Sequence, residues 1–362
     1  MNEPLRRIAA EFQMEDDARE CVAYGYGHIN DTYLVTCAGG RRYILQRIND
    51  RVFPHVDELM ENIASVTQFL RTKTEDPRRV LTLVPTTTCA SYLQSGEGAY
   101  WRMYDFIEGS LCLQSPESGA DFYQSALAFG DFQQRLSDYP AEALHETIAN
   151  FHNTVNRYKI FHETLERDPC GRARTVAREI EFALVREREA GCLMDGLRAG
   201  RLPLRVTHND TKLNNVLLDA KTRTPLCVID LDTVMPGSSL YDFGDSIRFG
   251  AATAAEDETD LDKVEMDLSL FETFTRGFLT ACPGLTSEEK RLLPTGAMLM
   301  TLECGLRFLT DYIDGDHYFA VHREGHNLDR CRTQFKLVAD MERKASRMGE
   351  LVWTIDGHNL KG

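Results

Sequence analysis

The 362-residue sequence lacks a hydrophobic run that could act as a signal peptide or cross a membrane. Residues 1–17 have no apolar core, because acidic residues from Glu11 onward interrupt them. The longest apolar stretch, residues 297–309, contains Glu303 and Arg307 and is shorter than the roughly 20 residues that span a bilayer. We therefore expect neither export nor a membrane partner.

Positive charge is also scarce. Lysine and arginine together number 41 against 56 aspartates and glutamates, which gives a formal net charge of −15. Such a surface repels the phosphates of nucleic acids, so no nucleic-acid partner is expected. The ten cysteines form no CxxC pair. In a long chain without an export signal they are expected to be reduced thiols, and the cytoplasm is the expected compartment.

Two common catalytic motifs are missing as well. The sequence contains neither a GxxxxGK[ST] phosphate-binding loop nor the HExxH pattern of zinc proteases. His322 and His326 have a metal-like spacing, but Gly325 lies between them, and we interpret both as structural histidines. The acidic run Glu256–Asp262 is interpreted as a solvated loop, the usual role of a charge run.

The N-terminal part of the sequence has a β-rich pattern with one helix. Residues 31–36 and 42–48 indicate two strands joined by a glycine-containing turn. Apolar residues then recur at helical spacing from Leu59 to Leu70. Residues 80–84 and 100–107 are predicted to form two further strands. A sheet with one helix inserted after its third strand is typical of the N-terminal lobe of a kinase.

Beyond Glu108–Ser110 the pattern becomes largely helical. An amphipathic helix is expected at residues 122–136, and short strands are expected around a polar loop within residues 204–229. Further helices are expected at 175–190, 263–280, 287–313 and 328–348. We predict an α+β, two-lobe fold: a nucleotide-binding lobe, residues 1–108, with an antiparallel sheet and one helix, and a larger, mostly helical catalytic and substrate-binding lobe, residues 109–362.

The strongest signal is the polar loop His208-Asn-Asp-Thr-Lys-Leu-Asn-Asn215, which precedes an apolar strand that ends at Asp230. The pattern HxDxKxxN, followed by a strand and an aspartate, is typical of the catalytic and metal-binding loops of kinases. Asp242 begins an Asp-Phe-Gly triplet, but no apolar strand leads into it. We interpret Asp242 as a structural acid that supports the loop.

Phosphoryl transfer needs positioning and charge neutralisation, and each residue of the loop answers one need. Asp210 is the candidate base that accepts the proton of the attacking hydroxyl. Lys212 is the candidate cation that neutralises charge on the transferred phosphoryl group. Asn215 and Asp230 offer oxygen ligands to the Mg²⁺ that accompanies a nucleoside triphosphate. His208 is expected to orient the loop through hydrogen bonds.

A glycine-rich segment between two strands is the candidate phosphate-covering turn. Gly25 and Gly27 occupy the first two places of GxGxxG, and Asn30 takes the third, because asparagine tolerates a positive φ better than other non-glycine residues. On a following strand, Arg47 falls where kinases carry a phosphate-binding lysine. A shift of one residue would put Gln46 there instead, and the sequence leaves this choice open.

Two further features complete the expected nucleotide site. Glu58 or Glu61, on the next helix, is expected to pair with Arg47, although both also fit solvated helix charges. The segment that contains Tyr104 and Phe106 joins the last strand to the helical region, and its backbone is expected to hold the adenine edge.

Several blocks resemble the aminoglycoside phosphotransferase and choline kinase superfamily and, within it, the N-acetylhexosamine 1-kinases. These blocks are residues 27–33, 43–49, 207–218, 229–237, 239–248 and 307–318. The resemblance implies a protein-kinase-like fold and the ATP- and Mg²⁺-dependent phosphorylation of N-acetylglucosamine or N-acetylgalactosamine at O1. It makes Asp210 the base acting on the anomeric hydroxyl, with Asn215 and Asp230 as the magnesium ligands.

The same resemblance implies contacts with the sugar. It places Asp245 and Arg307 among the polar sugar contacts, with Phe249 and Tyr318 lining a pocket for the acetamido group. All four also have a structural interpretation, the first two as an ion pair and the rings as core aromatics. The preference between the two sugars and the oligomeric state stay open.

Two other functions fit part of the pattern. A related kinase could take another small alcohol, such as an aminoglycoside, choline or homoserine, and an acidic cleft would suit a cationic acceptor. A nucleotide-binding module without activity is disfavoured, because Asp210, Lys212, Asn215 and Asp230 are all present. A protein kinase is disfavoured, because no Ala-Pro-Glu motif follows Asp230.

Overall fold

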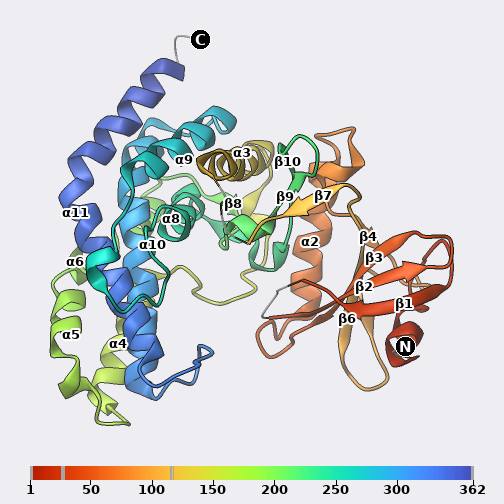
Figure 1. Cartoon of the computed structure of the whole chain (residues 1–362), viewed down its shortest axis with the longest axis horizontal. Coiled ribbons are helices and arrows are strands. Elements are labelled where there is room, and N and C mark those ends of the chain that lie inside the picture. The colour runs from red at the N-terminus through yellow and green to blue at the C-terminus, as the bar shows by residue number, and fades with distance from the viewer. Residues whose placement is uncertain (1–2, 26–28, 115, 117, 360–362) are drawn as a thin grey trace. The chain divides into compact units, whose positions relative to one another are not determined.

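The computed structural model describes residues 3–25, 29–114, 116 and 118–359, and it has the predicted α+β fold (Figure 1). The chain forms two compact units. Unit 1 comprises Met1–Leu111, Glu142–Ala149 and Leu217–Met235, and unit 2 comprises Cys112–Ala141, Asn150–Val216 and Pro236–Gly362. The predicted boundary after residue 108 lies close to the first division, but two later segments also belong to unit 1.

An antiparallel sheet is the main element of unit 1. Its strands run in the order β1-β2-β3-β6-β4, and β5 also pairs with β6. Their bounds are Ala18–Ala23 (β1), Asp31–Cys37 (β2), Arg42–Ile48 (β3), Leu83–Val84 (β4), Leu93–Gln94 (β5) and Tyr100–Asp105 (β6). The predicted hairpin is confirmed, because β2 and β3 pair from Asp31 with Arg47 to Thr36 with Arg42.

The helix predicted after the third strand is confirmed as α2, Val56–Arg71. Its periodic apolar side chains, including Leu59 and Ile63, are buried. Asn62 is also buried, and its Nδ2 donates to the His145 carbonyl at 2.8 Å and to the Val234 carbonyl at 3.1 Å. These bonds attach the two later segments of unit 1 to α2.

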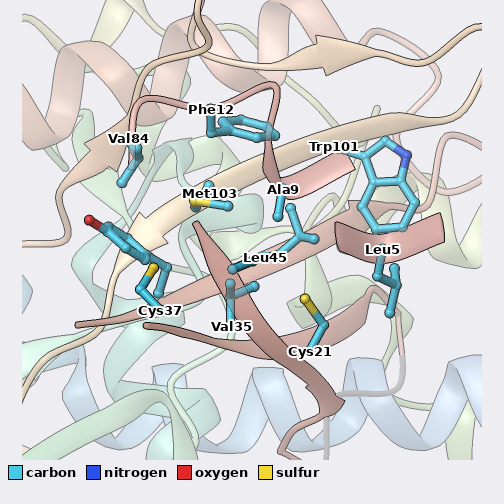
Figure 2. Close-up of a cluster of buried hydrophobic side chains, with 12 residues drawn as sticks. Leu5, Ala9, Phe12, Cys21, Val35, Cys37, Leu45, Val84, Trp101 and Met103 are labelled. Carbon is cyan, nitrogen blue, oxygen red and sulfur yellow. The ribbon is translucent and has the colours of Figure 1, made fainter. Parts of the chain in front are cut away.

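A hydrophobic cluster covers one face of the sheet (Figure 2). Strand β3 contributes Tyr43 and Leu45, and β6 contributes Met103. The N-terminal helix α1, Glu3–Ala9, which the sequence analysis did not predict, adds Leu5 and Ala9 to the cluster. Because successive side chains of a strand alternate between faces, the residues of β3 between these core positions lie on the opposite face.

Unit 2 is mostly helical. Its helices are α3 (Gly119–Arg135), α4 (Thr154–Arg167), α5 (Ala177–Leu184), α6 (Glu187–Ala190), α7 (Cys192–Arg198), α8 (Ser239–Gly250), α9 (Leu268–Ala281), α10 (Ser287–Asp314) and α11 (His326–Asn359). The helix predicted at 175–190 is two helices, and the one predicted at 263–280 begins later, where Asp267 caps α9. Of the remaining short strands, β8 (Arg205–Thr207) belongs to unit 2 and β10 (Pro225–Val228) to unit 1, and the points where the chain passes from one unit to the other fall within β7 (Ser110–Cys112), β9 (Val216–Asp219) and β11 (Met235–Gly237).

Helices α8 and α10 approach each other closely through two glycines. A side chain at Gly244 would meet the Gly296 carbonyl oxygen at 2.4 Å, and one at Gly296 would meet the Leu240 carbonyl oxygen at 2.7 Å. Helix α10 is long and apolar enough to cross a membrane, but 72% of its most apolar 18-residue window is buried inside the protein. Helix α10 is therefore buried as a core helix of the protein.

The cluster of unit 1 predicts the effect of a cavity. Replacing the fully buried Leu45 by alanine should lower the free energy of unfolding by about 2–5 kcal/mol, because the sheet cannot close around the lost methyl groups. Val22→Ala, at an exposed position of β1, should cost less than about 1 kcal/mol. Denaturant titration of both variants checks the expectation, and equal losses would contradict it.

Candidate active site

The polar loop 208–215 belongs to unit 2 and brings three predicted residues together. Lys212 Nζ lies 2.8 Å from a carboxylate oxygen of Asp210. Asn215 Nδ2 donates to the other carboxylate oxygen at 3.1 Å and to the Asp210 carbonyl at 2.8 Å. The chain turns sharply before Asp210, because Asn209 has a positive φ of 66°. A carboxylate, a cation and an amide therefore share one turn of the chain.

Two neighbouring carboxylates keep Lys212 positively charged. Burial lowers the pKa of Lys212, but Asp210 and Asp245 raise it more, so the pKa lies above its ordinary value and the side chain stays cationic. The Asp210 side chain is 27% exposed, which leaves it accessible to a substrate. Because Asn215 turns its amide nitrogen toward Asp210, its amide oxygen points away from Asp210.

Asp242 holds the backbone of the loop, and the structural role predicted for it is confirmed. Its fully buried carboxylate accepts the amides of His208 at 2.9 Å and Asn209 at 2.8 Å, as well as Gln133 Nε2 at 2.6 Å. Its carbonyl accepts the Thr211 hydroxyl at 2.7 Å. Because Asp242 lies on α8, the loop is fixed to that helix.

Asp245, one turn further along α8, holds the amide between the base candidate and the cation. Its Oδ2 accepts the Thr211 amide at 3.0 Å, and its Oδ1 accepts Arg248 Nε and Nη2 at 3.1 and 2.9 Å. Burial raises the pKa of Asp245, but Arg248 and Lys212 lower it more, so the carboxyl stays ionised. The ion pair of Asp245 is therefore with Arg248, and the alternative pairing with Arg307 is wrong.

His208 orients the loop from a fully buried position, as predicted. Its ring lies edge-on to Phe129 and Phe132, and its Nδ1 accepts the Asp210 amide at 3.3 Å. A second histidine, which the sequence analysis missed, also contacts the loop. His152 lies with Nε2 3.3 Å from the Asn209 carbonyl and Nδ1 2.9 Å from buried Glu303.

In unit 1, Asp230 follows β10 with a positive φ of 60° and an exposed side chain. Two residues later, Asp232 is 4% exposed, and it forms an ion pair of 2.5 Å with Arg102 Nη1. Arg102 lies on β6, is 1% exposed, and was missed by the sequence analysis. A lone arginine in the run Tyr100-Trp-Arg-Met-Tyr could have revealed it, because a charge in an apolar strand needs a partner.

The structure changes the interpretation of the glycine-rich segment. Gly25 has a positive φ of 79°, as a tight turn requires, and Gly27 lies outside the described residues. The positive φ expected at Asn30 is wrong, since Asn30 is not among the residues with a left-handed backbone. Its side chain instead donates to Asp232 at 2.5 Å and accepts the Asn49 amide at 2.9 Å.

The structure also resolves the orientation of β3. Arg47, the predicted phosphate-binding cation, is exposed and lies 3.8 Å from Asp31. Gln46 lies on the face opposite the hydrophobic cluster and accepts Arg102 Nε at 2.9 Å. Gln46, not Arg47, therefore lies beside Arg102, the ion-pair partner of Asp232.

The predicted pairing of Arg47 with a glutamate of α2 is wrong for the described residues. Glu61 binds His145 Nε2 at 2.9 Å, and Glu58 forms no ion pair with Arg47 within the part of the chain that the structure describes. The helix position that faces inward is taken by Asn62, which binds backbone groups and carries no charge.

Tyr104 and Phe106 lie at the end of β6, where the sheet already uses part of their backbone. Tyr104 pairs with Ile44 and Leu83, and the Phe106 amide donates to the Arg42 carbonyl at 3.2 Å. An adenine edge would therefore have to use amides beyond Phe106. The Phe106 ring is covered by the Arg42 guanidinium, 4.0 Å from its centre, and is half-buried.

Three of the predicted sugar contacts lie in unit 2 on accessible surfaces. Arg307, on α10, donates to the Tyr318 hydroxyl at 3.3 Å and lies 5.6 Å from the centre of the Phe151 ring. Tyr318 is 66% exposed, and Asp311 fixes its loop by accepting its amide at 2.8 Å. Because Phe249 and Tyr318 are both exposed, their interpretation as core aromatics is wrong.

Phe249 lines a cavity of 430 Å³, and Arg248 and Glu256 also line it. Small and apolar residues form much of its wall, including Gly250, Ala252, Ala254, Ala255, Leu270 and Leu337. The cavity lies wholly within unit 2, and it combines an apolar surface with one buried cation.

The contacts of the histidine pair support its structural interpretation. The acidic run is only in part the solvated loop that the sequence predicted, because Glu256, Asp257 and Glu258 are half-buried and form ion pairs. His326 accepts the His322 amide at Nδ1, 3.2 Å away, and its Nε2 lies 3.1 Å from Asp257. Glu256 binds Arg248 at 2.7 Å. In the described part of the chain, no three histidine, cysteine, aspartate or glutamate side chains gather as a metal site.

Solved structures share this fold over nearly their whole length. An aminoglycoside phosphotransferase from Alicyclobacillus acidocaldarius subsp. acidocaldarius DSM 446 is 13% identical, with a TM-score of 0.62 and coverage of 96% of this chain and 95% of that one. A microcompartment-associated aminopropanol kinase is 17% identical, with a TM-score of 0.58 and coverage of 96% and 98%. An amicoumacin kinase in complex with AMP-PNP, Ca²⁺ and amicoumacin is 12% identical, with a TM-score of 0.60 and coverage of 93% of each chain.

The fold is thus the protein-kinase-like fold that the sequence predicted, with an antiparallel N-terminal sheet and a larger helical part. The sequence also identifies the family of the protein. Residues 20–276 match the phosphotransferase enzyme family, and the chain belongs to that family. This match spans β1 to α9 and includes the whole loop 208–215, which confirms the predicted superfamily.

The buried carboxylate of Asp242 gives the first prediction about the site. In Asp242→Asn, one of the donors now bound by the carboxylate would face an NH₂ group, so unfolding should become easier by about 1–3 kcal/mol. Asp267→Asn is the matched control, because asparagine caps a helix about as well as aspartate. Thermal unfolding compares the two, and equal stability of both variants would count against the anchoring role.

Proposed function

We propose that the protein is a small-molecule kinase that uses ATP and Mg²⁺ to phosphorylate the anomeric O1 of N-acetylglucosamine or N-acetylgalactosamine. The observation that carries the proposal is the Asp210 carboxylate, which is partly exposed and held between Lys212 and Asn215 on a loop fixed by two buried acids. Membership of the phosphotransferase enzyme family supports the reaction type. The sugar rests on the resemblance of the sequence blocks.

The loop residues divide the chemistry between them. Asp210 accepts the proton of the attacking hydroxyl. The hydrogen bond from the Thr211 amide to Asp245 fixes the backbone next to Asp210, which keeps the Asp210 carboxylate in place. An anomeric hydroxyl is more acidic than an ordinary alcohol, so a carboxylate accepts its proton more readily. Burial lowers the pKa of Lys212, but Asp210 raises it more, so the side chain stays cationic. Lys212 thus supplies positive charge to the transferred phosphoryl group.

Two of the predicted ligands fit magnesium by their chemistry. Mg²⁺ prefers oxygen ligands, and Asn215 directs its amide oxygen away from Asp210 while Asp230 exposes a carboxylate. When bound, the ion neutralises charge on the phosphates of the nucleotide. The amicoumacin kinase, which was solved with AMP-PNP and Ca²⁺, supports a nucleotide together with a divalent cation as ligands of this fold.

The predicted sugar contacts are compatible with an N-acetylhexosamine. Arg307 and Tyr318 offer donors at an exposed edge of unit 2, and Phe249 offers an apolar surface beside the 430 Å³ cavity. Asp245 is already bound to Arg248 and Thr211, so we assign it the positioning of the loop in addition to any bond to the sugar. A small, diffusible substrate and ATP also agree with a cytoplasmic enzyme that needs neither nucleic acid nor membrane.

The acceptor is tested by a panel of alcohols incubated with the protein and Mg-ATP. We expect turnover of N-acetylglucosamine and N-acetylgalactosamine to exceed that of glucose, choline, homoserine and an aminoglycoside by about tenfold or more, because a lost buried hydrogen bond reduces binding strongly. A sugar 1-phosphate is acid-labile, whereas an ordinary phosphate ester is not, so mild acid identifies the product. An acid-stable product from choline, homoserine or an aminoglycoside would replace the sugar by that acceptor.

The role of Asp210 is tested by Asp210→Asn. Loss of the proton acceptor should reduce kcat by about 10²–10⁴-fold while ATP binding changes little. Asp195→Asn is the control, since Asp195 is an exposed aspartate with Arg198 3.5 Å away, and it should turn over normally. Unchanged turnover of Asp210→Asn would remove Asp210 from the base role.

A further inference from the structure

A row of polar side chains crosses the sheet of unit 1 on the face opposite the hydrophobic cluster. Thr32 of β2 pairs with Gln46 of β3, which pairs with Arg102 of β6. The side chains follow the same order, because Gln46 Nε2 donates to the Thr32 hydroxyl at 3.0 Å and Gln46 Oε1 accepts Arg102 Nε at 2.9 Å. The guanidinium is thus oriented from the sheet side.

The row ends in a buried ion pair. Arg102 Nη1 lies 2.5 Å from Asp232, and the two side chains are 1% and 5% exposed. Burial lowers the pKa of Arg102, but Asp232 outweighs it, with a further contribution from Asp230, so the guanidinium stays charged. A buried charge is costly without its partner, so each side chain fixes the position of the other.

Asp232 also holds the end of the glycine-rich segment. Its second carboxylate oxygen accepts Asn30 Nδ2 at 2.5 Å. Asn30 Oδ1 accepts the Asn49 amide at 2.9 Å, and Asn49 Nδ2 donates to the Ile29 carbonyl at 3.2 Å. The third place of GxGxxG is therefore fastened by its side chain to an acid two residues beyond Asp230.

We propose that Asn30, Asp232 and Arg102 form a positioning triad for the nucleotide. The triad sets Asn30, the last residue of the glycine-rich motif, and the Asp230 segment at one fixed spacing within unit 1, so that ATP meets both in a fixed geometry. This deepens the proposed function and rests on it. Arg102 acts through Asp232 and not on the phosphates, because it is fully buried, and the exposed Arg47 has no part in the triad.

A purely structural role would produce a different result from a positioning role. A stabilising triad would affect unfolding first, and nucleotide affinity only as far as the folded fraction falls. A positioning triad affects nucleotide affinity even where stability is kept. Two variants of the full chain separate these roles by titration with Mg-ATP and by thermal unfolding, and neither measurement requires an acceptor.

The first variant, Asn30→Ala, removes the side-chain bonds of Asn30 to Asp232 and to the Asn49 amide, and it leaves both members of the buried ion pair in place. We expect Mg-ATP affinity to fall about tenfold, the equivalent of about 1.4 kcal/mol, while Tm changes by only a few degrees. Asn153→Ala is the matched control. Asn153 caps α4 in unit 2, so this change should lower Tm without changing the affinity for Mg-ATP.

The second variant, Arg102→Met with Asp232→Leu, replaces the ion pair by apolar side chains. Such a replacement commonly keeps stability, so Tm should stay close to that of the wild type. Mg-ATP affinity should nevertheless fall as far as in Asn30→Ala, because Asn30 has lost its partner. A folded double variant that binds Mg-ATP like the wild type would overturn the triad, and if it does not fold, Asn30→Ala alone decides.

Failure of the triad and failure of the proposed function give different results. A wild-type protein that does not bind Mg-ATP would refute the proposed kinase. A wild-type protein that binds Mg-ATP, together with an Asn30→Ala variant of equal affinity, would refute the triad and leave the kinase standing.

Discussion

The site of unit 2 depends on one constraint: a buried carboxylate must be surrounded by hydrogen-bond donors. Asp242 satisfies this constraint with two consecutive amides of the polar loop, and Asp245 satisfies it with a third amide and Arg248. Both acids lie on α8. That helix is in turn locked against α10, where Gly244 and Gly296 allow the two backbones to touch. The loop is therefore held rigidly against α8 and α10, and this fixes the position of the Asp210 carboxylate.

Unit 1 uses the same arrangement with a different partner. There, the buried Asp232 stands two residues from the exposed Asp230, and it is held by an ion pair with the Arg102 guanidinium on β6 and by the side-chain amide of Asn30. In both units an accessible aspartate is followed or supported by a buried one. In the proposed function the accessible acid does the chemistry, and the buried acid fixes its position. This division explains why a second acid near each functional aspartate is more than a redundant charge.

The sequence predicted those parts of the fold that depend on local pattern. Alternation and helical spacing located β2, β3, α2, α3 and α10, because burial of one face repeats at short intervals. The spacing of the loop predicted that the side chains of Asp210, Lys212 and Asn215 would lie close together, since all three belong to one short loop. Helices α1, α4, α7 and α8 were not predicted.

The parts that the sequence could not provide depend on contacts between distant residues. Arg102 and Asp232 are far apart in the chain, and only the strand register shows that Gln46, and not Arg47, lies beside Arg102. The positive φ that the motif predicted for Asn30 was wrong, and its side chain binds Asp232, which no local pattern reveals.

The most direct test of the account is a crystal structure of the protein with AMP-PNP, Mg²⁺ and N-acetylglucosamine. The account predicts the sugar O1 within about 2.6–3.2 Å of the Asp210 carboxylate, with oxygens of Asn215 and Asp230 bound to the metal. A sugar bound with O1 away from Asp210, or a metal held by neither residue, would contradict it.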